Sequence, residues 1–130
     1  MRITLEADYA IRIMDCLTGS GKRLCAKTLS DKTGVSHRFA LKILRKLCMA
    51  KMVRSHKGIQ GGYELIKKPE EISLKDVIEA IDGPIIINRC QENRTCSMLG
   101  DPELCAFHSV FAEISNLIDN KLTTVTFDKK

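Results

Sequence analysis

Three of the six cysteines in this 130-residue chain lie in one segment, RCQENRTCSMLGDPELCAFH, at residues 89–108. Five residues separate Cys90 from Cys96, eight separate Cys96 from Cys105, and two separate Cys105 from His108. Structural zinc sites usually contain two tight ligand pairs, whereas this segment offers one, Cys105 with His108. Iron–sulfur clusters accept thiolates at looser spacings, and histidine can replace cysteine on an iron atom. The segment is therefore a candidate metal or cluster site.

Two other chemistries are open to the same cysteines. A thiol sensor needs only two of the three, so thiol oxidation is an alternative to metal ligation. Glu6 and Asp8 stand where a signal peptide would be apolar, so the sequence favours a cytoplasmic location. Because thiols stay reduced in the cytoplasm, a structural disulfide is disfavoured. No apolar run approaches the roughly 20 residues that a membrane span requires. We expect the other cysteines to be core or near-core residues, namely Cys16, Cys25 and Cys48.

The charge of the chain is divided unevenly between its halves. Residues 1–68 carry 15 Lys and Arg side chains and 5 Asp and Glu side chains, a net charge of +10. Residues 69–130 carry 6 and 11, a net charge of −5. A basic first half is typical of a module that binds a polyanion such as DNA, and the acidic second half indicates a separate role. An uneven distribution of solvated charge is the alternative.

The basic half contains the pattern of a helix-turn-helix. After a first helix over residues 5–17, capped by Thr4, helices are predicted over about residues 26–33 and from Ser36 to about Met49. In the last of these, Phe39 and apolar residues at helical spacing should pack inward. The opposite face should contact phosphates and base edges in the major groove through Ser36, His37, Arg38, Leu41, Lys42 and Arg45. An ordinary amphipathic surface helix is the alternative.

A basic hairpin follows in MVRSHKGIQGGYELIKKP, residues 52–69. Two short β-prone runs flank a turn that requires glycine, at Gly58, Gly61 and Gly62. We expect Arg54, His56 and Lys57 to contact the DNA backbone or minor groove. A helix-turn-helix followed by a hairpin is a winged helix. The predicted fold is thus mainly α with a small β-hairpin wing: a winged helix-turn-helix plus a long C-terminal dimerisation helix.

The acidic half should begin with a helix from Ser73 to about Ile81 and end with a long amphipathic helix from about Ala106 to Lys121. In so small a chain the last helix has little core to cover, so it should pair with the same helix of a second subunit. Its apolar stripe contains Val110, Phe111, Ile114, Leu117, Ile118 and Leu122. The expected organisation is a DNA-binding domain at residues 1–83, a cluster-binding loop at 84–105, a dimerisation helix at 106–122 and a flexible tail at 123–130.

Together these features resemble the Rrf-type bacterial winged-helix transcriptional regulators, which include IscR-like, NsrR-like and CymR-like proteins. The resemblance is most specific in KGIQGGYELIKKPEEISLKDVIEAIDGP, residues 57–84, and extends to DYAIRIM near the start. It implies a homodimer in which Cys90, Cys96 and Cys105 hold an iron–sulfur cluster, either [2Fe-2S] or [4Fe-4S]. The implied fourth ligand is His108, as in IscR-like members, or Asp8 from the partner subunit, as in NsrR-like members.

The chain departs from the family pattern at two places. The eight-residue spacing between Cys96 and Cys105 is longer than is usual in the family, and Phe111 stands where tryptophan is common. A few extra flexible residues cost only a fraction of a kcal/mol in closure entropy, so the longer loop can still close on a cluster.

The sequence therefore predicts a cytoplasmic homodimeric regulator, with repression as the expected mode, that binds a palindromic operator in double-stranded DNA. Its DNA affinity would be controlled by the iron–sulfur cluster. A cluster-free regulator of the same fold, sensing thiol oxidation or a partner protein, is the first alternative. A small metal or redox protein is the second. No acid–base pair or substrate-pocket motif is found, so we do not expect an enzyme.

Overall fold

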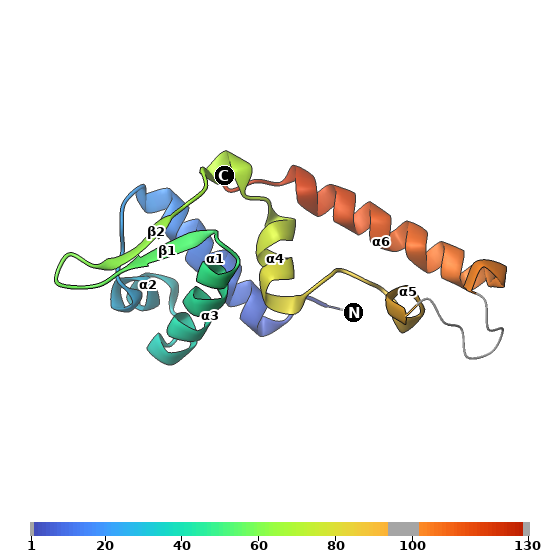
Figure 1. Ribbon diagram of the computed structural model, residues 1–130, viewed down its shortest axis with the longest axis horizontal. Helices are drawn as coiled ribbons and strands as arrows, with labels where there is room; N and C mark the ends of the chain where they lie inside the picture. Colours follow the sequence, from blue (N-terminus) through green and yellow to red (C-terminus); the bar gives the residue numbers. More distant parts are fainter. Residues whose placement is uncertain (1, 94–101, 129–130) are drawn as a thin grey trace.

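The computed structural model describes residues 2–93 and 102–128 (Figure 1). It confirms the predicted fold class, a mainly helical protein with one two-stranded antiparallel hairpin. Within the described residues, no helix is long and apolar enough to cross a membrane. In chain order the elements are α1 (Leu5–Ser20), α2 (Ala26–Thr33), α3 (His37–Met49), β1 (Val53–His56), β2 (Gly62–Leu65), the 3-10 turn η1 (Pro69–Glu71), α4 (Leu74–Asp82), α5 (Arg89–Asn93), the 3-10 turn η2 (Pro102–Leu104) and α6 (Ala106–Thr124).

The core lies among α1, α2, α3 and α4, where α1 and α3 contact each other and both of the other helices. Helix α1 begins where the Thr4 hydroxyl accepts a hydrogen bond from the Ala7 amide, and α3 begins where Ser36 accepts one from Phe39. Apolar side chains at helical spacing fill the core from both helices, including Ile13 and Leu17 from α1 and Ile43 and Leu47 from α3. The expectation that Phe39 packs inward is wrong. Phe39 is 43% exposed, and its ring contacts Tyr9 of α1 edge-on with the ring centroids 6.0 Å apart.

The wing is the β1–β2 hairpin, with Val53 paired to Leu65 and His56 paired to Gly62. All three of its glycines are required by the backbone. Gly58 and Gly62 have φ of +97° and +135°, a region that side chains rarely adopt, and a Cβ on Gly61 would lie 2.3 Å from the His56 carbonyl oxygen. The base of the wing is anchored by reciprocal hydrogen bonds between the backbones of Leu24 and Tyr63, at 3.0 and 2.7 Å. The hairpin is thereby held against the segment that precedes α2.

Residues 123–128 return to the core, where a flexible tail was expected over residues 123–130. Helix α6 continues to Thr124, and the Leu74 amide then donates to the Val125 carbonyl at 2.8 Å. The amide of Phe127 donates to Ile72, and its ring is only 7% exposed in the core. Burial of this aromatic ring stabilises the return of the chain as far as residue 128. Residues 129–130 lie outside the described part of the chain.

Helix α6 extends away from the winged-helix body as an arm, on the opposite side from the hairpin (Figure 1). It packs against α4, and Lys75 of α4 forms a 2.9 Å ion pair with Asp119 of α6. The segment expected to be a loop at residues 84–105 contains the short helix α5, which lies beside the N-terminal half of α6. The arm therefore connects the cysteine segment to the winged-helix body.

Candidate functional site

The predicted major-groove residues lie on the outer face of α3. His37, Arg38, Leu41, Lys42 and Arg45 are all exposed, and Ser36 is exposed at the helix start. The Ser36 oxygen caps the Phe39 amide at 3.3 Å, which leaves its hydroxyl hydrogen for donation to an outside acceptor. The structure thus brings all six residues to one basic surface.

An acidic side chain that the sequence did not single out borders this surface. Glu6 of α1 lies 3.3 Å from the amino groups of both Lys42 and Lys46 of α3. Burial raises the pKa of Glu6, but the contacts with Lys46 and Lys42 outweigh burial, so the pKa lies below its ordinary value. A DNA phosphate approaching Lys42 would therefore compete with Glu6 for this amino group.

Replacing Glu6 with glutamine should lower the free energy of unfolding at neutral pH by about 0.5–1 kcal/mol, the range of a favourable surface ion-pair network. Because the folded-state pKa is lowered, the stabilisation is present above the unfolded-state pKa and is lost as pH falls through the folded-state value. Urea denaturation of Glu6→Gln and the unsubstituted chain should therefore converge as pH falls below about 4. Asp31→Asn, at an exposed acid of α2, is the control and should show no such convergence. A deficit for Glu6→Gln that is constant with pH would contradict the ion-pair explanation.

The three residues predicted to contact DNA from the wing differ in how exposed their side chains are. Arg54 and Lys57 are exposed, whereas the ring of His56 is half-buried and its Nε2 lies 2.5 Å from a carboxylate oxygen of Glu64 across the hairpin. This hydrogen bond lowers the pKa of Glu64, and Arg23 lies 3.6 Å from the same oxygen. Arg23 also donates to the Gln60 carbonyl at 3.1 Å. Arg23, which precedes α2, therefore adds a cation beside the wing. Its place in the sequence gave no local signal of its contacts with Glu64 and Gln60.

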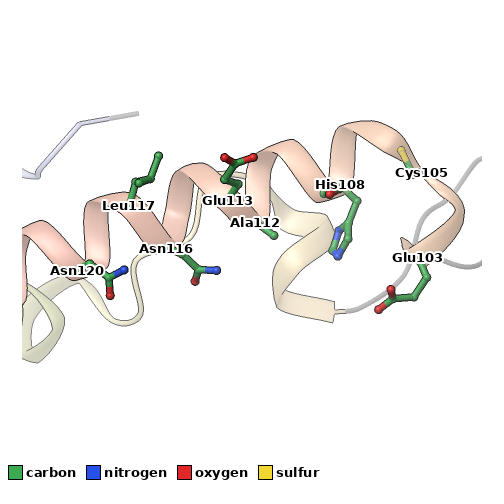
Figure 2. Close-up of a pocket in the computed structure, with 9 residues that line it drawn as sticks. Glu103, Cys105, His108, Ala112, Glu113, Asn116, Leu117 and Asn120 are labelled. Carbon is green, nitrogen blue, oxygen red and sulfur yellow. The ribbon is translucent and has the colours of Figure 1, made fainter.

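The cysteine segment brings two predicted ligands into contact. Cys90 of α5 and His108 of α6 approach to 3.3 Å between Sγ and Nδ1. Figure 2 shows the His108 ring pointing from α6 toward the neighbouring segment, and Cys105 one turn earlier, directly before the helix. Cys90, Cys105 and His108 line one cavity of about 300 Å³, whose remaining walls are Asn88, Phe107 and Phe111. Cys96 lies outside the described residues.

The chemistry of this donor set fits an iron–sulfur cluster. Two thiols and an imidazole border the same cavity, and two aromatic rings provide apolar walls, which limit solvent around such a group. Among residues 2–93 and 102–128, no three His, Cys, Asp or Glu side chains are arranged to hold a single metal ion. The described donors are thus neighbours around a cavity and not a closed mononuclear site.

The second candidate for the fourth ligand lies elsewhere. Asp8 forms a 3.1 Å ion pair with Arg12 one turn along α1. It lines a separate hollow with Arg2, Ile3, Thr4, Leu5 and Ile11. Within one subunit, the structure therefore brings His108, and not Asp8, next to a described cysteine of the segment, Cys90.

The three remaining cysteines divide into two kinds. Cys16 and Cys48 are half-buried and pack against the core, as expected, and burial raises the pKa of Cys48. The expectation for Cys25 is wrong. It is exposed at the start of α2, where a hydrogen bond with Thr28 at 3.1 Å lowers the pKa of its thiol. Its place directly before a helix, outside the apolar face, explains the exposure.

The predicted dimerisation stripe leaves much apolar surface uncovered. Leu117 is 63% exposed and Val110 48% exposed, while Phe111, Ile118 and Leu122 are half-buried and Ile114 lies between these extremes. Phe107, which the sequence did not single out, extends the exposed stripe at 72% exposure. Isolated exposed apolar residues are common, but a continuous exposed stripe along one helix is typical of an interaction surface.

The chain matches known proteins over nearly its whole length. The family model of Rrf2, described as an iron-dependent transcriptional regulator, matches residues 3–129. A helix-turn-helix transcriptional regulator of Mycobacterium tuberculosis is 40% identical over 87 residues, which cover 65% of this chain and 54% of that protein, so the chain spans about half the length of this relative.

Two further comparisons agree with this match. The transcriptional regulator IscR of Pectobacterium atrosepticum is 28% identical over 131 residues, covering 99% of this chain and 78% of its own. The solved structure of CymR, the global cysteine regulator of B. subtilis, shares the fold with a TM-score of 0.79 at 23% identity, covering 98% of this chain and 94% of that one. The chain belongs to the Rrf2 family, whose members are transcriptional regulators and not enzymes.

Proposed function

We propose that this chain is a homodimeric DNA-binding repressor whose DNA affinity is controlled by an iron–sulfur cluster. The observation that carries the proposal is the contact between Cys90 and His108 at the junction of α5 and α6, with Cys105 on the same cavity. Membership of a family described as iron-dependent regulators supports it.

DNA binding is supported by the basic outer face of α3 and by the wing. Helix α3 would enter the major groove, with Ser36 at its start, and Arg54 and Lys57 would contact backbone phosphates. A twofold dimer places two such surfaces against two half-sites, so the expected operator is palindromic double-stranded DNA. His56 would contribute only after leaving Glu64.

The cluster would be held by Cys90, Cys96 and Cys105, with His108 as the fourth ligand. A bound cluster supplies a redox-active and oxidant-sensitive group, either [2Fe-2S] or [4Fe-4S]. Asp8 of the partner subunit is the alternative fourth ligand. The role of this chain's own residues is to join the ligands to α6, because His108 is part of that helix and Cys105 directly precedes it. A change at the ligands would then alter the arm that connects the two reading surfaces.

Anaerobic purification tests the cluster directly. The full chain should be brown, absorb in the visible range, and contain iron and acid-labile sulfide in equal amounts. A colourless product without iron, purified under conditions in which another Rrf2 cluster protein retains its cluster, would contradict the proposal.

Replacing Arg38 with alanine should weaken binding to an operator selected from random duplex DNA by about 30-fold or more, because one good base contact of about 1–3 kcal/mol is lost in each of the two subunits. Lys57→Ala should weaken binding to all duplexes alike and reduce the salt dependence by about one counterion per subunit. Fluorescence anisotropy across a salt series measures both. Lys121→Ala, at an exposed cation of α6, is the control. Unchanged affinity in both wing and helix variants would rule out this DNA-binding surface.

A cluster-free thiol sensor of the same fold is a second candidate. It is favoured by the half-exposed positions of Cys90 and Cys105 on an open cavity, where an oxidant could reach both thiols. In that case the iron-free chain should bind the operator when reduced and lose affinity after mild peroxide treatment, with recovery after addition of a thiol reductant.

A further inference from the structure

A single side-chain oxygen joins α5 to α6. Oε1 of Gln91 accepts three hydrogen bonds, from the Ile87 amide at 2.9 Å, the Asn88 amide at 3.2 Å and the Ser115 hydroxyl at 3.0 Å. The Ile87 amide also lies 3.2 Å from the Ser115 oxygen. These four groups form a closed network between the two helices, which we call the Gln91–Ser115 network.

Part of the Gln91–Ser115 network is buried, where a polar group without a hydrogen-bond partner destabilises the folded state. Ser115 is 6% exposed and is the buried residue of α6, whose apolar residues are otherwise partly or largely exposed. A buried hydroxyl or amide that lacks a hydrogen-bond partner destabilises the fold, whereas one whose partners are complete fixes a particular geometry. The contact between α5 and α6 is therefore set by directed bonds and not by apolar packing alone.

The position of the network relates it to the proposed ligands. Gln91 follows Cys90 directly, and Ser115 lies seven residues, or two helical turns, after His108 on the same side of α6. A helix of five residues has no independent stability, so the position of α5 depends on such contacts. The network thus holds the segment that carries Cys90 against the helix that carries His108.

We propose that Gln91 and Ser115 are positioning residues: they hold Cys90 against His108 and transmit changes at the cysteine site to α6. This inference rests on the proposed function only for the identity of the group that Cys90 binds. The placement of Cys90 itself is a property of the protein chain and can be tested without a cluster.

The three bonds on Gln91 allow a matched pair of substitutions. All three partners donate to Oε1, so the carboxylate of Gln91→Glu can accept the same bonds, whereas the thioether of Gln91→Met has a similar shape and loses them. Ser115→Ala removes one donor. Asn120→Ala, at an exposed amide of α6 outside the network, is the control.

The first measurement is the alkylation rate of Cys90 by iodoacetamide in the full chain without iron, followed by peptide mass spectrometry. Gln91→Met should increase the rate about tenfold, as expected for the loss of one to two hydrogen bonds that hold α5, and Ser115→Ala should give a smaller increase. Gln91→Glu should not raise the rate above that of the unsubstituted chain, because the hydrogen bonds are kept and the added carboxylate disfavours the reactive thiolate. Cys25, exposed and distant in sequence, is the internal control in each sample.

The second measurement is hydrogen exchange at the Ile87 and Asn88 amides, which should accelerate about tenfold in Gln91→Met and remain slow in Gln91→Glu. In chain purified with iron, Gln91→Met should retain less than half of the iron and sulfide that Gln91→Glu retains. A merely structural role would lower thermal stability equally in both variants and leave the Cys90 rate unchanged. That result, or failure of glutamate to restore the rate, would overturn the inference. If the unsubstituted chain binds no iron, the proposed function fails, while the alkylation and exchange results still decide the role of Gln91.

Discussion

Cys90→Ala purified anaerobically should be colourless and contain less than about a tenth of the iron and sulfide of the unsubstituted chain. Cys90 is the described thiol in direct contact with His108, and it borders the cavity that Cys105 also lines. Removal of one thiolate opens the coordination of an iron atom to solvent, where clusters are rapidly lost. Visible absorbance, iron and sulfide analysis measure the effect, and circular dichroism establishes that the variant remains folded.

The matched control for this prediction is Cys48→Ala. Cys48 is half-buried at the end of α3, packs against the core and has a pKa raised by burial, so it should remain a thiol and bind no iron. This variant should keep the full chromophore. Retention of colour in Cys90→Ala, or its loss in Cys48→Ala, would show that the cluster lies elsewhere in the chain.

The winged helix could be predicted from the sequence because its signals are local. Capping residues marked the helix starts, and the structure places Thr4, Ser36 and Ser73 at these positions with their side chains bonded to backbone amides. The glycines of the wing indicated a turn, and the backbone requires all three of them. Each of these patterns spans fewer than about ten residues, so no knowledge of the tertiary packing was needed.

Contacts between distant segments could not be predicted in the same way. The pairing of Glu6 with Lys46 joins residues 40 positions apart and depends on how α1 crosses α3. The burial of Phe127 depends on the return of the chain to α4, and a single aromatic residue in a short polar segment has no periodicity to reveal it. The first contact had no counterpart among the sequence-based expectations, and the second corrects the expectation of a flexible tail at residues 123–130.

In the candidate cysteine site, too, the local signals could be predicted from the sequence and the contacts between segments could not. The residue types and spacing predicted thiolate and imidazole ligands, but the contact of Cys90 with His108 requires α5, which is too short to give a helical pattern. It also requires Gln91 and Ser115, two polar residues whose hydrogen bonds exist only after α5 meets α6. The assignment of Cys96 as a ligand remains a prediction, since that residue lies outside the described part of the chain.

The exposed stripe of α6 supports a further prediction of large effect, on the proposed homodimer. Phe107, Val110, Ile114 and Leu117 follow one another at steps of three, four and three residues, the spacing of a helix that pairs with another along one seam. Leu117 is among the most exposed of them. In a twofold interface each substitution occurs twice, so a charge there is introduced on both sides.

Leu117→Glu should therefore convert the dimer to a monomer. Burying an unpaired charge costs at least about 2 kcal/mol for each copy, or about 4 kcal/mol for the pair, which raises the dissociation constant of the dimer by about 1,000-fold. Analytical ultracentrifugation at micromolar concentration measures the change, with Thr123→Glu, at an exposed polar position of the same helix, as the control. Operator affinity should fall with dimerisation in Leu117→Glu and remain unchanged in Thr123→Glu, because one subunit alone contacts one half-site. A Leu117→Glu protein that remains dimeric would show that the subunit interface lies on another surface. In that case α6 could not be the element through which the cysteine site changes the spacing of the two DNA-binding surfaces.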